Sequence, residues 1–187
     1  MMMTTHALIG ALVGAAVAPF APGATPAAVV VGFAGGAAPD VDLIATHRRS
    51  THFPILGSAV AIALAAVAVG TGTLAATLLA VFAVAAAVHC LMDALAGGVE
   101  IRPWEATSEQ AVYNHVGGYW VHPRRWVRYA GAPEDLLLAA GAALPLLVTT
   151  TGRVRTAVAC VLAVSAGFVA VRRRLPAVTD RLLAGAE

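Results

Sequence analysis

Seven histidine and aspartate side chains stand out in a largely apolar sequence. Imidazole and carboxylate groups together suit Zn²⁺, Mn²⁺ or Fe²⁺ better than Ca²⁺, which prefers oxygen ligands alone. One catalytic zinc ion takes about three or four ligands from protein. The set therefore predicts either two ions or one ion whose ligands are oriented by further side chains. The candidate metal ligands are His6, Asp40, Asp42, His47, His52, His89 and Asp93.

The firmest pair is His89 and Asp93, within AVAAAVHCLMDALAGG. Side chains at this spacing project from one helix face with Cβ atoms about 6 Å apart, which suits a single metal centre. Ionisable groups in a membrane helix are costly and usually face a partner or a wet cavity. A structural hydrogen bond between His and Asp on neighbouring helices is the alternative that this pair alone leaves open.

Residues 38–53, APDVDLIATHRRSTHF, add two carboxylates and two imidazoles. Carboxylates at alternate positions of an extended segment point to opposite sides. We therefore expect one of Asp40 and Asp42 to bind metal directly, while the other orients a histidine or holds a second ion. His47 and His52 follow within the same short segment.

Asp40 and Arg48 are the candidate catalytic residues. In a hydrolase, a metal centre lowers the pKa of bound water to about 7 and polarises the scissile group. Arg48 lies beside His47, and its planar guanidinium suits an anionic substrate such as a phosphate. A role in membrane topology or in contact with lipid head groups fits Arg48 equally well.

The elements that must position these residues are helices. Of 187 residues, 59% are hydrophobic and 12% charged, about half the charged fraction of soluble domains. A formal charge of +2, without a dense basic stripe, argues against nucleic acid as a partner. Because a crossing takes about 20 helical residues, some of the helices are too short to span a membrane fully. The sequence predicts an all-α integral membrane bundle of about six helices, near 5–19, 26–37, 54–69, 73–98, 134–151 and 155–171.

Alternating helix directions would bring the chain start, residues 38–53, the loop 99–133 and the C-terminal tail to one face. Every histidine and acidic residue, His6 included, then lies on or near that face. Of the 12 basic residues, all arginine, only Arg153 and Arg155 fall on the opposite face. The positive-inside rule therefore predicts that the metal site faces the cytoplasm.

The second half of the chain is expected to carry an aromatic loop, two membrane helices and a basic tail. Every Trp and Tyr lies between residues 104 and 129, as an interfacial belt or as a lid over the metal site. His115 and His122 share this loop, and their spacing gives them no role. Within a single domain, we divide the chain into a metal-site region, 1–105, and the remainder, 106–187.

In their order along the chain, TH, PDVD, HRRSTHF and HCLMDALAGGVEIRPWE resemble the motifs of the YdjM-like family. These are bacterial, inner-membrane-associated, LexA-binding metal-dependent hydrolases. The resemblance covers roughly residues 1–105. Arg49 stands where that family often has Gly, which indicates that the turn after Arg48 needs no positive φ, and Phe53 replaces a frequent Ser. The matching positions are His6, Asp40, Asp42, His47, Arg48, Thr51, His52, His89 and Asp93.

These observations favour a membrane-bound, metal-dependent hydrolase at the cytoplasmic interface of the inner membrane, acting on a phosphoester or lipid substrate. The alternative is a metal-stabilised scaffold or docking protein without activity, for which the resemblance implies a LexA-like regulator as partner. The expected partners are otherwise membrane lipid and the substrate itself. A metal transporter is least favoured, because the middles of the helices offer almost no polar residues along a path.

Overall fold

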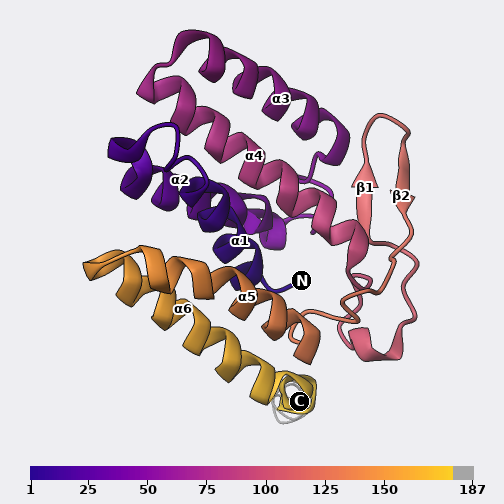
Figure 1. Ribbon diagram of the computed structural model, residues 1–187. Helices are drawn as coiled ribbons and strands as arrows, with labels where there is room; N and C mark the ends of the chain where they lie inside the picture. The colour runs from indigo at the N-terminus through magenta and orange to yellow at the C-terminus, as the bar shows by residue number, and fades with distance from the viewer. Residues whose placement is uncertain (179–187) are drawn as a thin grey trace.

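The computed structural model describes residues 1–178, and most of them are helical (Figure 1). The predicted all-α membrane bundle is confirmed, with one small addition. An antiparallel hairpin pairs β1 (Val112–Asn114) with β2 (Tyr119–Val121) inside the aromatic loop. The helices of the described part are α1 (Met3–Ala15), α2 (Thr25–Ala37), α3 (Pro54–Thr71), α4 (Leu74–Leu95), α5 (Pro133–Thr149) and α6 (Gly152–Val171), with short 3₁₀ helices η1 (Pro22–Ala24), η2 (Ala38–Ile44), η3 (Pro103–Glu105) and η4 (Arg172–Arg174).

Two helix ends differ from the predicted ones for identifiable reasons. The first helix ends at Ala15 because the ring of Pro19 would clash with the Ala15 carbonyl, one helical turn back. The fourth ends at Leu95, just before Gly97 and Gly98, which favour chain reversal over helix. The predicted second helix, 26–37, is extended at both ends, because η1 and η2 continue α2.

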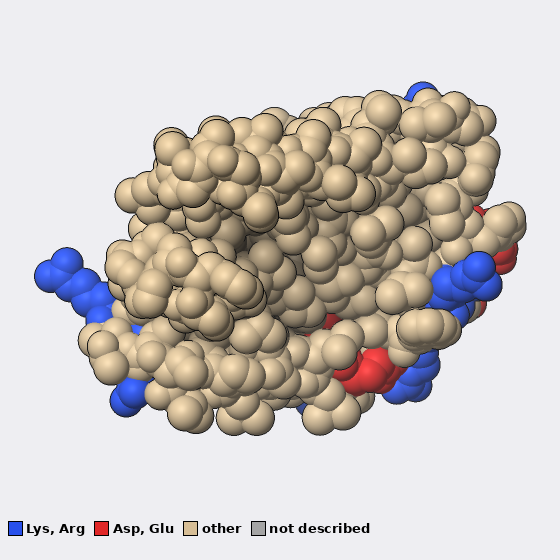
Figure 2. Space-filling view, turned by 45° about the horizontal axis from the view of Figure 1, so that its top comes forward, with Lys and Arg blue, Asp and Glu red and all other residues tan. Residues whose placement is uncertain are grey.

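Within residues 1–178, four segments are long and apolar enough to cross a membrane: Pro22–Ile44, Pro54–Thr71, Leu74–Leu95 and Gly152–Val178. The 13-residue α1 is too short to do so alone. Uncharged side chains cover most of the face seen in Figure 2, and charged side chains gather toward its two ends. A face of this kind is expected where lipid, and not water, surrounds the protein.

The central helices α1 and α2 pack between α3 and α4 on one side and α5 and α6 on the other (Figure 1). Glycines let α1 and α2 approach closely, as small residues do between membrane helices. A Cβ added to Gly10 would lie 2.2 Å from the Gly32 carbonyl oxygen, and one added to Gly36 would lie 2.3 Å from that of His6. This contact brings the start of α1 against the end of α2.

Side chains from both halves of the chain share one apolar core. Leu8 of α1 and Val29 of α2 pack with Leu146 of α5 and Val158 of α6. Because successive helices alternate in direction, the start of α1, the end of α2, the start of α3, the end of α4 and the start of α5 meet at the end of the bundle that carries the hairpin (Figure 1). The candidate site lies at this end.

Candidate metal centre

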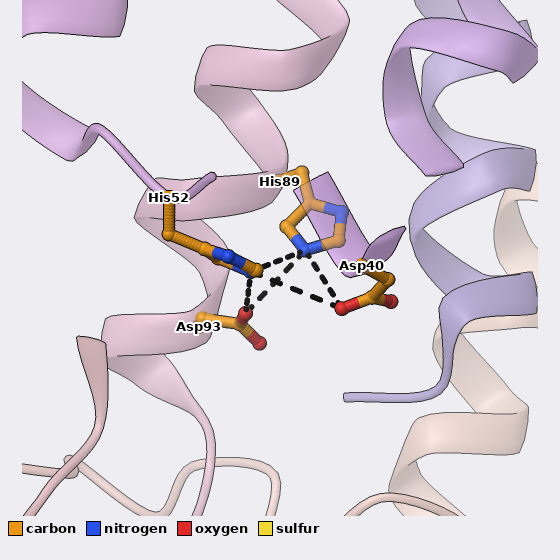
Figure 3. A group of neighbouring side chains, drawn as sticks. All are labelled: Asp40, His52, His89 and Asp93. Carbon is orange, nitrogen blue, oxygen red and sulfur yellow. Dashed lines mark hydrogen bonds and ion pairs between the residues drawn. The ribbon is translucent and has the colours of Figure 1, made fainter. Parts of the chain in front are cut away.

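Four buried side chains direct one potential ligand atom each toward a common point (Figure 3). Asp40 comes from η2, His52 from the residue pair before α3, and His89 and Asp93 from the last turns of α4. Their ligand atoms all lie within 4.8 Å of one another. The cluster thus joins three segments that are separate in sequence, and it contains the predicted pair on α4.

The spacing of these atoms fits one metal ion. Ligands on a tetrahedral ion with bonds of about 2.0–2.1 Å lie about 3.3 Å apart. The Nε2 atoms of His52 and His89 are 3.1 Å apart. Asp93 Oδ2 lies 3.2 Å from the first and 3.4 Å from the second. Asp40 Oδ1 lies 3.5 Å from His89 Nε2 and 3.8 Å from His52 Nε2.

The hydrogen bonds made by Nδ1 of His52 and of His89 determine whether the Nε2 atom of each ring carries a proton or a lone pair. His52 Nδ1 donates to Asp42 Oδ2 at 2.9 Å, and His89 Nδ1 donates to the Gly36 carbonyl at 2.6 Å. Carboxylate and carbonyl oxygens only accept, so each Nδ1 carries the proton of the neutral ring. Each Nε2 then presents a lone pair to the other and to two carboxylates. A cation at the centre of these four acceptors would relieve their mutual repulsion, and the residues therefore fit a divalent metal.

Asp42 lies outside this group and holds the segment that supplies His52. Its Oδ2 also accepts from the backbone nitrogens of Arg49 and Thr51, at 3.3 and 3.5 Å. Its Oδ1 accepts from His47 Nδ1 at 2.9 Å. Of the two neighbouring carboxylates, the structure thus places Asp40 in the cluster and uses Asp42 to orient two histidines, the arrangement typical of residues behind metal ligands.

The second oxygen of Asp93 is held by groups outside the four-residue cluster. Its Oδ1 lies 3.2 Å from His6 Nε2, 3.1 Å from the nitrogen of Met1 and 3.4 Å from Arg48 Nη2. The His6 ring stacks on that of His89, with centroids 3.7 Å apart. His6 therefore contacts the metal cluster without belonging to it. Direct ligation by His6, Asp42 or His47 remains a prediction.

Arg48 is buried and points inward. Its Nη1 donates to the carbonyls of Gly97 at 2.6 Å and Ala111 at 3.3 Å, in addition to the ion pair with Asp93. The residue adopts φ 60°, the left-handed conformation that side chains other than Gly rarely take. Arg49 does not share it, in agreement with the sequence-based expectation. An arginine that is free to bind phosphate would not be held by these contacts. In the structure Arg48 instead positions Asp93.

The hairpin supports the ligand segment from outside. Tyr113 N donates to the Arg48 carbonyl at 2.9 Å, and His115 Nε2 donates to the Arg49 carbonyl at 2.7 Å. His122, the other histidine of the loop, lies away from the cluster and hydrogen-bonds to exposed Glu109. This bond lowers the pKa of the Glu109 carboxyl below its usual range. A positioning role for His115 had no signal in sequence spacing.

Asp135 is a buried anchor whose importance the sequence does not reveal. Its carboxylate accepts from Met2 N at 2.8 Å, from Thr5 Oγ1 at 2.7 Å and from Gly131 N at 3.0 Å. At the sequence level it is only an acidic residue at a helix start, where it suits the helix dipole. In the structure it fixes the start of α1, and hence His6, against α5.

A cavity of about 350 Å³ borders the cluster. It is bounded by the start of α1, η2, residue 130 and α6, and both Asp40 and His47 contribute to its wall. Ala130 is the only residue of the aromatic loop among those described at this wall, so the aromatic side chains do not cover it. Trp126 is 73% exposed, as an interfacial belt requires.

The fold and the cluster can now be set beside known proteins. The sequence model of a family described as YdjM inner membrane protein matches residues 1–174. The match extends well beyond the motif-bearing region, through α5 and α6. No curated protein and no solved structure gave a match. Because the family match spans nearly the whole chain, and four segments are apolar enough to cross a bilayer, the chain belongs to the YdjM inner membrane protein family.

Proposed function

We propose that the protein is a metal-dependent hydrolase whose metal site lies at the cytoplasmic interface of the inner membrane. The observation that carries the proposal is the cavity beside the metal cluster, with Asp40 in the wall of one and the ligand set of the other. A purely structural centre needs no such cavity. The chemistry that a divalent ion would supply there is activation of water and polarisation of the bond to be cleaved.

The protein's own residues would divide the remaining work. Asp40, His52, His89 and Asp93 would hold one ion, of Zn²⁺, Mn²⁺ or Fe²⁺ type. His47 is the least buried of these histidines, with a side chain 32% exposed, and it lines the cavity beside Asp40. It would therefore contact the group being cleaved, or join in holding a second ion. Arg48 and Asp42 would keep the ligands in place.

Multi-pass insertion with the site facing the cytoplasm belongs to the same proposal. The four apolar segments support several crossings. Arg153 and Arg155 begin α6, at the end of the bundle away from the cluster, and nearly all other arginines lie on the cluster side. This charge asymmetry supports a cytoplasmic site. A phosphoester or a lipid ester at head-group depth is the substrate class that such a position offers.

A second candidate is a metal-stabilised scaffold that docks a regulator of the LexA type. It is favoured by one observation: the four ligands suffice to complete a tetrahedral ion without water, as in structural zinc sites. In that case the metal would stabilise the fold, and the cavity would have no reactant.

Metal analysis of detergent-purified protein tests both candidates first. We expect about one transition-metal equivalent per chain, lost in the double variant His89→Ala with Asp93→Ala. The matched control, His122→Ala with Glu109→Gln, removes a hydrogen-bonded His–carboxylate pair far from the cluster and should retain the metal. Equal metal content in both variants would disprove the centre. Turnover of phosphoester and lipid ester substrates by the loaded protein then separates hydrolase from scaffold.

A further inference from the structure

The cavity beside the cluster is polar at the end that meets the metal group and mostly apolar along the rest of its wall. Where it meets the metal group, Asp40 and His47 are polar. Apart from Thr4, whose hydroxyl accepts from Ser165, the rest of the wall is apolar and includes Leu43 of η2 with Val164 and Phe168 of α6. A pocket with one polar end and an otherwise apolar wall suits a molecule with a polar head and a hydrocarbon body.

Among the described residues, the mouth of the cavity is made of apolar side chains that are at least half exposed. Met3 is 50% exposed, Leu43 67% and Val164 62%. Leu43 and Val164 belong to two of the segments that are apolar enough to cross a membrane, Pro22–Ile44 and Gly152–Val178. The mouth therefore lies between two lipid-facing segments, where a ligand arrives more easily from the bilayer than from water.

The opposite approach, from the hairpin side, is closed. The Arg48 side chain fills that side, tied to the carbonyls of Gly97 and Ala111, and only 4% of the residue is exposed. A water-soluble substrate would meet this closed wall or the apolar mouth. Apart from the partly exposed His47, neither offers the polar entrance that such a substrate needs.

Arg172 places a positive charge at the rim of the cavity. Arg172 Nε donates to the Ala130 carbonyl and Nη2 to the Ile101 carbonyl, both at 3.2 Å, and its guanidinium carbon lies 5.9 Å from the centre of the Phe168 ring. Unlike Arg48, Arg172 has no carboxylate as partner among the described residues, and its Nη1 is the nitrogen left to face a ligand. Both Ala130 and Phe168 line the cavity. A positive charge beside an apolar pocket is complementary to an anionic head group on a hydrocarbon chain.

From these features we propose that the cavity binds one hydrocarbon chain of an anionic membrane lipid, which enters sideways from the bilayer and places its head group between the metal cluster and Arg172. The inference rests on the proposed function, because it takes the cleaved bond to lie next to that head group. It narrows the substrate class from phosphoesters and lipid esters to membrane lipids with an anionic phosphate head group.

Protection of a reporter cysteine tests this independently of turnover. The full chain would carry Ala130→Cys with the exposed Cys160→Ala, in nanodiscs of phosphatidylcholine, and its reaction with a water-soluble maleimide would be timed. Dodecyl phosphate should slow labelling at least tenfold, and methyl phosphate at the same concentration should not. If residue 130 does not react without ligand, Leu43→Cys reports from the opposite wall.

Two further variants separate chain binding from charge. Val164→Trp fills the cavity and should abolish protection, whereas Val171→Trp, on the same helix but outside the cavity wall, should preserve it. Arg172→Gln should weaken protection by dodecyl phosphate and leave protection by dodecanol unchanged. Equal protection by methyl phosphate, or full protection in Val164→Trp, would overturn the inference even in an active hydrolase. Selective protection without any turnover would instead retain the lipid site and remove the hydrolase.

Discussion

Replacement of Asp42 probes the cluster without removing any of its four ligand atoms. In the native carboxylate, Oδ1 accepts from His47 and Oδ2 accepts from His52. The backbone nitrogens of Arg49 and Thr51 also donate to Oδ2. In Asp42→Asn the amide oxygen must take the Oδ2 position, because those backbone groups can only donate. The new NH₂ group then faces His47, which has to accept through Nδ1 and change its tautomer.

The magnitude follows from the hydrogen bond that His52 keeps. A hydrogen bond to a charged group contributes about 1.5–3 kcal/mol and one between neutral groups about 0.5–1.5 kcal/mol. The difference, about 1–1.5 kcal/mol, corresponds to a roughly tenfold loss of metal affinity in Asp42→Asn. Asp42→Ala leaves His52 without an acceptor, and there we expect a loss toward 100-fold, the upper range for residues behind metal ligands.

Competition with a chromophoric chelator for Zn²⁺, in detergent, measures these affinities, while circular dichroism checks that the helices persist. Glu109→Gln is the matched control, since Glu109 accepts from His122 at 2.8 Å on the exposed loop, and its affinity should equal that of the native protein. The reasoning fails if the Asn and Ala variants of Asp42 bind Zn²⁺ as tightly as the native chain. It also fails if the control loses affinity to the same extent.

Three more outcomes follow from the structure. Gly10→Ala should destabilise the fold by about 1–3 kcal/mol, because its Cβ would lie 2.2 Å from the Gly32 carbonyl oxygen. Gly141→Ala, whose Cβ would meet nothing within 4 Å, should leave the stability unchanged. Thermal unfolding in detergent compares the two variants. Asp135→Ala leaves the buried backbone nitrogens of Met2 and Gly131 without their acceptor and the Thr5 hydroxyl with only the 3.4 Å bond to the carbonyl of residue 135. It should lower the unfolding free energy by about 3 kcal/mol, which denaturant titration would detect. Removal of metal with EDTA should lower the melting temperature, since an ion at about 100 times its Kd stabilises a fold by about 2.7 kcal/mol; an unchanged melting temperature after confirmed removal would contradict the cluster.

Helices and candidate ligands could be predicted because both follow local rules. Apolar runs interrupted by proline and glycine mark the helices, and α2 through α6 begin or end within a few residues of the predicted bounds. The spacing of His89 and Asp93 on one helix places both on a single face. The alternation of helix directions is enough to gather the polar ends of the chain, and Asp40, His52, His89 and Asp93 do meet there.

The roles within that set depend on contacts that sequence spacing does not encode. Whether His6 binds metal or orients Asp93 depends on how closely α1 approaches α2, which the glycine contacts between their backbones determine. The sequence by itself determined a membrane bundle with imidazole and carboxylate groups gathered at one end, because helix periodicity and apolar length are properties of single segments. Only the tertiary structure decided which atoms converge, that Arg48 turns inward and that a cavity reaches Asp40, because each of these depends on distances between segments remote in the chain.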